Sequence, residues 1–151
     1  MRLNDSRGWC QIQLSVETEE TIGNQKETEI IEEEIVKSII IQSKESCVNY
    51  KLANKHFHNY TKLMCIVLKK NNEILYKLIK HEEPSVKSAG AYFLLQYDKS
   101  LAEKTLKSLY KISKDTIGFN AKMIMREWKN RRLKFPKLKE GKIIYESTTP
   151  P

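Results

Sequence analysis

Residues 81–112 read HEEPSVKSAGAYFLLQYDKSLAEKTLKSLYKI, and this stretch decides the fold. Pro84 is suited to the first position of a helix, because the N–H that proline lacks would have no partner there. The small residues at 88–91 allow a neighbouring helix to approach closely. Asp98 is a typical N-cap for a second helix, and apolar residues recur after it at helical spacing. The stretch therefore predicts two consecutive helices, over residues 84–97 and 99–113.

Helical periodicity continues on both sides of this pair. Upstream, apolar residues recur at steps of three and four, and Asn71 with Asn72 interrupts the pattern. Downstream, Asp115 is a candidate cap for a last helix, whose expected core includes Phe119 and Trp128. The further helices are expected over residues 27–50, 51–69, 73–81 and 115–130.

These elements predict an all-α fold, a short antiparallel array of five to six helices joined by short turns. We expect three parts along the chain. The first is a loosely ordered acidic head over residues 1–26, and the second is the helical domain over residues 27–133. The third, residues 134–151, is a tail that is basic and then Thr/Pro-rich. We expect its end to fray, with docking through Ile143, Ile144 and Tyr145 as the alternative.

The two central helices resemble the helix pair of HEAT-type repeats. That pattern has an acid and a proline at a turn, a valine and a base, small alanines, and an aspartate before the second helix. Lys87 stands where arginine is usual, and Gly90 stands where alanine is usual. Residues 28–136 are similar to a small bacterial HEAT-like domain family of unknown function. The matching residues are Glu83, Pro84, Val86, Lys87, Ala89, Ala91 and Asp98.

The resemblance implies a function in binding. Some small HEAT-like proteins are immunity proteins that accompany secreted toxins, so it implies a toxin domain as one kind of partner. It supplies no catalytic residue.

The net charge of the chain is unevenly distributed. The 151 residues contain 27 Lys and Arg against 19 Asp and Glu, a formal net charge of +8. Residues 1–36 hold three bases and nine acids, a net charge of −6. Residues 37–151 hold 24 bases and 10 acids, a net charge of +14. This basic body predicts an acidic partner, whereas the plainer alternative is an acidic head that folds back weakly on the body.

The type of base favours protein over nucleic acid. The chain has 22 Lys and only 5 Arg. Arginine binds phosphate and guanine with a planar fork, whereas lysine acts as a hydrated point charge. We therefore expect an acidic protein partner, with nucleic acid as the alternative. No apolar run is long enough to span a bilayer, so we expect no membrane partner and a cytoplasmic protein.

A cluster of bases on the helical domain is the candidate binding surface. Positions 104, 107 and 111 lie on one face of a helix, opposite its leucine stripe. In HEAT-type stacks the second helix of each pair lines the concave side. Here those would be the helices over residues 73–81 and 99–113, so their lysines would share one surface. The alternative is an ordinary solvated face in a lysine-rich protein. The candidate partner-binding residues are Lys77, Lys80, Lys104, Lys107, Lys111 and Arg126.

Chemistry-bearing residues do not form a recognisable catalytic or metal-binding pattern. His56 and His58 are two residues apart on a helix, so they do not face one ion, and we expect both at the surface. Cys10, Cys47 and Cys65 are an odd number without close spacing, which predicts reduced thiols. We expect a non-enzymatic protein-binding module, with no catalytic residue, no metal and no cofactor.

Overall fold

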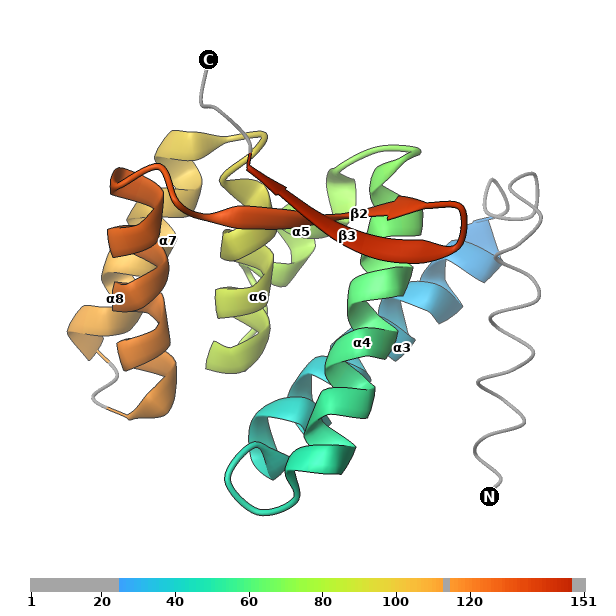
Figure 1. Ribbon diagram of the computed structural model, residues 1–151, viewed down its shortest axis with the longest axis horizontal. Helices are drawn as coiled ribbons and strands as arrows, with labels where there is room; N and C mark the ends of the chain where they lie inside the picture. The colour runs from blue at the N-terminus through green and yellow to red at the C-terminus, as the bar shows by residue number, and fades with distance from the viewer. Residues whose placement is uncertain (1–24, 113–114, 148–151) are drawn as a thin grey trace.

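The computed structural model describes residues 25–112 and 115–147 of the chain. In this part, six helices are followed by a two-stranded hairpin (Figure 1). The helices are α3 (Gln25–Glu45), α4 (Tyr50–Leu68), α5 (Glu73–Leu78), α6 (Pro84–Leu94), α7 (Lys99–Ile112) and α8 (Thr116–Lys129). The hairpin consists of β2 (Lys134–Lys139) and β3 (Lys142–Ser147).

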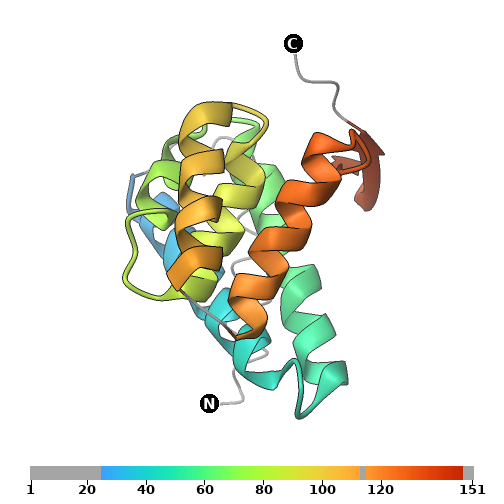
Figure 2. The ribbon, with the colours of Figure 1, turned by 90° about the vertical axis from the view of Figure 1, so that its left-hand side faces the viewer.

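The helices pack as sequential pairs. α3 packs against α4, α5 against α6, and α7 against α8, while α6 also contacts α7 and α3. Figure 2 shows α7 and α8 side by side, with the hairpin beyond α8 on the side away from α7. The prediction of five to six packed helices is therefore confirmed, and the predicted all-α fold is incomplete because a C-terminal hairpin follows the helices.

Short polar side chains begin the helices where the sequence indicates. The Leu101 amide donates to Asp98 Oδ1 at 3.3 Å, and the Ile117 amide donates to Asp115 Oδ1 at 3.0 Å. Pro84 occupies the first turn of α6. Each cap satisfies an N–H that the first helical turn leaves without a partner. Both predicted aspartate caps and the predicted proline position are confirmed.

The first helix differs from its predicted limits. α3 begins at Gln25 and ends at Glu45, whereas the sequence predicted a helix over residues 27–50. Gln25 and Lys26 therefore belong to the helix and not to a loose head. The remainder of the predicted head, residues 1–24, lies outside the described residues.

The close approach of α5 and α6 depends on Gly90. A Cβ atom at Gly90 would lie 2.6 Å from Leu78 Cβ, well inside van der Waals contact. The small residues predicted to admit a neighbouring helix therefore do so at this position. Glycine, where the HEAT-type pattern usually has alanine, is explained by this contact.

The C-terminal hairpin is the main departure from the sequence prediction. β2 and β3 pair antiparallel from Lys134 opposite Ser147 to Lys139 opposite Lys142. The two turn residues have positive φ angles, 51° at Glu140 and 76° at Gly141, as a tight type I′ hairpin turn requires. The tail therefore does not fray before Ser147.

Phe135 joins the hairpin to the helices. Its side chain is 0% exposed and stacks on Tyr92 of α6, with ring centroids 5.0 Å apart. It also meets Trp128 of α8 edge-on at 6.1 Å. The Tyr92 hydroxyl donates to the Lys134 carbonyl. A lone hairpin is marginal in water, so these contacts to the helices are what stabilise it.

Two predictions about the last helix have different outcomes. Trp128 is buried, as the sequence predicted. Phe119 was predicted to lie in the core, and this is wrong because its side chain is 62% exposed. Phe119 lies in the first turn of α8, where the described structure places no helix over it.

Replacing Gly90 with alanine is expected to destabilise the protein by about 1 kcal/mol. Alanine favours a helix by about 1 kcal/mol relative to glycine, but overpacking at a buried contact costs about 1–3 kcal/mol. Urea unfolding followed by circular dichroism measures the net effect. Ser108→Ala, at an exposed position of α7, is the control and should stay within about 0.5 kcal/mol of the wild type. A more stable Gly90→Ala protein would contradict the close contact.

Replacing Phe135 with alanine is expected to lower the free energy of unfolding by about 3–5 kcal/mol, as for other buried aromatic residues. The exposed Phe119 offers a matched control, and Phe119→Ala should change stability by less than about 0.5 kcal/mol. The same urea experiment measures both. Equal effects of the two substitutions would show that the hairpin does not depend on Phe135.

Candidate functional site

Three of the predicted binding residues share one surface of α7. Lys104, Lys107 and Lys111 are exposed and line one shallow depression. None of the three forms an ion pair with a described residue. At 1.5 Å per helical residue, the row extends for about 10 Å along the helix. We call these three residues the lysine ridge.

The carboxylate beside the lysine ridge is held by another contact. Glu103 also lines the depression, but its Oε2 accepts a hydrogen bond from Trp128 Nε1 at 2.9 Å. This bond ties α7 to α8 and orients the carboxylate toward the indole of the neighbouring helix. The ridge therefore keeps a positive charge that Glu103 offsets only in part.

An exposed apolar side chain lies at one end of the ridge. Ile112, the last residue of α7, is 80% exposed and lines the same depression as the three lysines. A large apolar side chain exposed beside a charged surface adds contact area to that surface.

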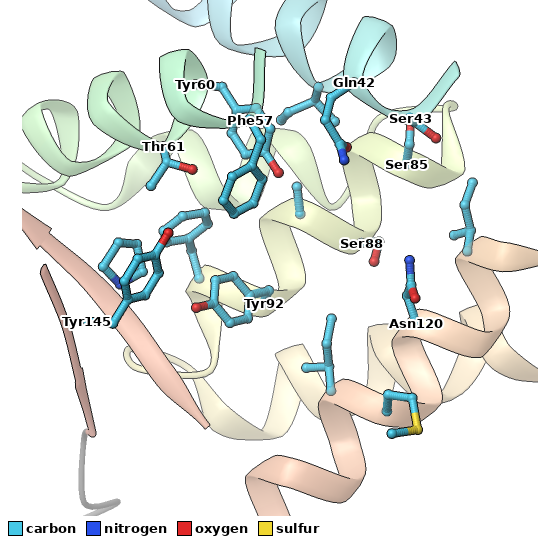
Figure 3. Close-up of a pocket in the computed structure, with 17 residues that line it drawn as sticks. Gln42, Ser43, Phe57, Tyr60, Thr61, Ser85, Ser88, Tyr92, Asn120 and Tyr145 are labelled. Atoms are coloured by element: carbon cyan, nitrogen blue, oxygen red, sulfur yellow. The ribbon is translucent and has the colours of Figure 1, made fainter. Parts of the chain in front are cut away.

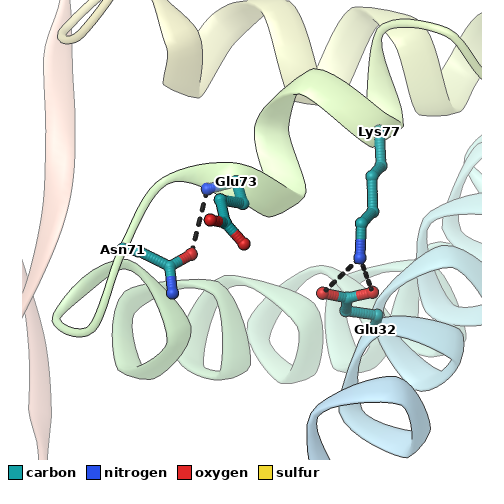
Figure 4. Close-up of polar contacts among 4 residues, drawn as sticks. All are labelled: Glu32, Asn71, Glu73 and Lys77. Atoms are coloured by element: carbon teal, nitrogen blue, oxygen red, sulfur yellow. Dashed lines mark hydrogen bonds and ion pairs between the residues drawn. The ribbon is translucent and has the colours of Figure 1, made fainter. Parts of the chain in front are cut away.

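Lys77 lies in a different environment from the ridge. Its Nζ bonds Glu32 Oε1 at 3.0 Å and Oε2 at 3.4 Å, which links α5 to α3 (Figure 4). Lys77 lines a second depression, the Lys77 depression, which Glu29 and Glu33 also line. The figure also shows the Glu73 amide donating to Asn71 Oδ1 at the start of α5, where the sequence predicted a helix break.

The pair of Lys77 and Glu32 joins two helices of the helical domain, so it does not test whether an acidic head folds back on the basic body. An exposed pair of this kind contributes at most about 1 kcal/mol. The other two predicted residues, Lys80 and Arg126, are exposed and line neither the Lys77 depression nor that of the ridge.

A cavity of about 350 Å³ is the main feature that the sequence analysis missed. Figure 3 shows side chains of α3, α4, α6 and α8, together with β2 and β3, facing it. Its walls combine aromatic rings with hydroxyl and amide groups. The polar and aromatic residues of the lining are Gln42, Ser43, Phe57, Tyr60, Thr61, Ser85, Ser88, Tyr92, Phe93, Asn120 and Tyr145.

The cavity was invisible in the sequence because its lining comes from six elements. Pro136 and Tyr145 reach it only through the hairpin, which periodicity did not predict. One local signal existed. Ser85 and Ser88 lie on the same face of α6 as Ala89. If this face packed against a filled core, apolar side chains would be expected at both serine positions.

His56 is partly buried, which corrects the prediction of two surface histidines. Its Nδ1 lies 3.5 Å from Ser38 Oγ of α3, whereas His58 is exposed. Burial lowers the pKa of His56, and Lys55 and Lys37 add to this effect. Burial therefore favours the neutral form of His56, whose contact with Ser38 joins α4 to α3.

Cys65 is a buried thiol. Its Sγ donates to the Pro136 carbonyl at 3.5 Å, which ties α4 to β2. Burial raises the pKa of Cys65 to about 11, although Lys137 and Lys69 act in the opposite direction. A thiol of this pKa is almost wholly protonated at neutral pH, so Cys65 is a weak nucleophile.

Comparison with protein-family models, with curated proteins and with solved structures finds no match to this chain. Among residues 25–112 and 115–147, none of the helices combines the length and hydropathy that crossing a bilayer demands.

The thiol of Cys65 is expected to react about 100-fold more slowly with iodoacetamide at pH 8 than an ordinary thiol, because its thiolate fraction is lower by that factor. Single-thiol variants test this. Cys10→Ser with Cys47→Ser leaves Cys65, and Cys10→Ser with Cys65→Ser leaves the exposed Cys47 as the matched reference. Mass spectrometry follows labelling with time. Equal rates for the two proteins would contradict the burial of Cys65.

Proposed function

We propose that this protein is a non-enzymatic binding module whose lysine ridge engages an acidic surface of a partner protein. The observation that carries the proposal is the row of three exposed lysines on α7, none of them in an ion pair with a described residue. Unpaired charges on one helix face are available to a partner without first breaking an internal contact. Lys77 is left out of this surface because Glu32 already holds it.

The charge of α7 supports an acidic partner. The helix carries four lysines and one glutamate, and the following helix adds Lys122, Arg126 and Lys129 against Glu127. Such a surface raises the rate of encounter with an acidic protein and disfavours basic ones. Lysine stems are flexible, so the ridge adapts to carboxylates in more than one arrangement.

Ile112 supplies apolar contact area beside the ridge. Apolar side chains that become buried in a protein interface slow dissociation. In this proposal the lysines act mainly on the association rate, and Ile112 acts mainly on the lifetime of the complex.

The HEAT-like resemblance extends the proposal to an immunity protein, whose acidic partner would be a domain of a cognate bacterial toxin. The support is the HEAT-type pattern around Pro84 and Asp98, together with helices that pack as sequential pairs. This step rests on analogy of fold and not on the chemistry of a particular site. We also place the protein in the cytoplasm, for which the free thiols of Cys47 and Cys65 are suitable.

Nucleic acid is the second candidate partner. The ridge favours it because three lysines in a row could follow a phosphate backbone, and neutralising three phosphates predicts a salt slope of about −3. The absence of arginine from α7 counts against specific base recognition.

The triple substitution Lys104→Glu, Lys107→Glu and Lys111→Glu is expected to slow association with the partner at least about tenfold, because it reverses the steering charge. The wild type and the variant are each immobilised and exposed to lysate of the source cells, and retained proteins are identified. The rate of association of the retained partner is then measured at about 50 and 200 mM salt. The wild-type rate should fall steeply as salt increases.

Lys51→Glu, Lys55→Glu and Lys70→Glu form the matched control, since these exposed lysines change the net charge equally but lie away from α7. The control should keep most of the wild-type rate. If the ridge variant associated at the wild-type rate, the lysine ridge would be excluded as the binding surface. Retarded migration of random-sequence duplex DNA at about 150 mM salt, lost in the ridge variant alone, would favour the nucleic-acid alternative.

A further inference from the structure

The cavity between the helices and the hairpin contains a hydroxyl without a partner. Thr61 is 1% exposed, and its Oγ1 is buried and forms no hydrogen bond. Figure 3 shows this oxygen directed into the space between α4, α6 and the hairpin. Buried hydroxyls are nearly always bonded, and one left unbonded lowers the stability of the fold. Thr61 is therefore oriented for a group that occupies the cavity.

A second threonine forms the hydrogen bond within its helix that Thr61 lacks. Thr105 Oγ1 of α7 donates to the Leu101 carbonyl of its own helix at 2.9 Å. Threonine in a helix commonly forms this bond to the residue four positions earlier. Thr61 has the same opportunity with the carbonyl of Phe57, but its hydroxyl is not bonded there.

The walls of the cavity fit a ring. Phe57 and Tyr60 meet edge-on with centroids 5.4 Å apart, and Tyr92 and Tyr145 also line the space. Burial raises the pKa of Tyr60, and the nearby hydroxyls of Tyr92 and Tyr145 act in the same direction. The tyrosines therefore remain neutral, and the Tyr92 hydroxyl, which already donates to the Lys134 carbonyl, keeps its oxygen as an acceptor. A volume of about 350 Å³ falls at the small end of ligand pockets.

The lining also indicates the charge of the occupant. Among the described residues, no Asp, Glu, Lys, Arg or His side chain lines the cavity. A charged ligand would lose part of its hydration there without gaining a counter-charge, which is unfavourable. A neutral ligand loses little on entry.

We propose that this cavity binds a small neutral molecule that has an aromatic or aliphatic ring and one hydroxyl or carbonyl group, and that this group bonds Thr61 Oγ1. The ring packs among Phe57, Tyr60 and Tyr92, and the polar group meets the unpaired hydroxyl on α4. α7 contributes no residue to the lining, so this site is separate from the lysine ridge and stands or falls independently of it.

Three probes of similar size test the proposal on the full chain. p-Cresol is neutral with one hydroxyl, toluene lacks the hydroxyl, and 4-methylbenzoate carries a negative charge. Each is titrated while amide chemical shifts are recorded by ¹⁵N–¹H NMR. p-Cresol should bind with a dissociation constant on the order of 1 mM, as expected for so small a ligand. Its shifts should map to α4, α6, α8 and β3.

The other two probes separate the proposal from non-specific binding. The chain has a net charge of +8, so non-specific attraction would favour 4-methylbenzoate. In the proposed site it should instead bind at least about tenfold more weakly than p-cresol, because its carboxylate is not compensated. Toluene should bind about three- to tenfold more weakly than p-cresol, since it leaves Thr61 unpaired.

Thr61→Val keeps the shape of the side chain and removes the hydroxyl. It should reduce p-cresol affinity to that of toluene and leave toluene affinity unchanged. Thr105→Val is the matched control, because its hydroxyl is bonded within α7, and it should bind all three probes as the wild type does. Ala89→Leu introduces a larger side chain into the lining and should abolish binding of both neutral probes.

Several results would overturn the proposal. One is that p-cresol causes no chemical-shift changes up to about 20 mM. Another is that its shift changes are scattered over the surface. Either would mean that the cavity holds water only. Another is 4-methylbenzoate binding as tightly as p-cresol. The last is a Thr61→Val protein that still prefers p-cresol to toluene as strongly as the wild type does. If Thr61→Val does not fold, the comparison of the three probes on the wild-type protein still decides the charge and polarity of the occupant.

Discussion

The contact of Phe135 with Tyr92 and Trp128 is the interaction on which the C-terminal half of the structure depends. It attaches the hairpin to α6 and α8 at once. The hairpin then brings Pro136 to the Cys65 thiol and to the cavity, and it brings Tyr145 into the cavity wall. Because a two-stranded ribbon has little stability of its own, the buried Phe135 ring is the main apolar contact that keeps these residues in place, and hydrogen bonds from Tyr92 and Cys65 add to it.

Contacts between neighbouring helices also determine which charges remain available. Trp128 donates to Glu103, so the acid that lines the depression of the lysine ridge is oriented toward the indole. Glu32 holds Lys77, so that lysine belongs to the packing of α3 on α5. Six bases looked equivalent in the sequence. Lys77 is paired with Glu32, Lys80 and Arg126 line neither depression, and the other three share one surface.

The cavity and the lysine ridge are two independent features of one small fold. The cavity has neutral walls and a hydroxyl without a partner, whereas the ridge is exposed, charged and shallow. Neutral concave sites suit small molecules, and charged exposed helices suit macromolecules. The two proposals therefore concern separate parts of the structure, and α7 carries only one of them.

Much of the helical part was predictable because its signals are local. Asp98 and Asp115 cap helices, Pro84 begins one, and the leucine stripe of α7 is buried where periodicity places it. A cap or a stripe depends on residues within one or two turns, and such residues are close together in the sequence. The exposure of Phe119 was not predictable, because periodicity identifies an apolar face but not whether another element covers it.

The sequence by itself determined where the helices lie, which residues begin them, and the basic charge of the body. The tertiary structure decided that residues 134–147 form a hairpin, that Gly90 meets Leu78, and that a cavity with an unpaired Thr61 opens between six elements. The reason is physical. Helix formation is governed by neighbours along the chain, whereas a lone hairpin and a cavity exist only through contacts between residues that are far apart in it.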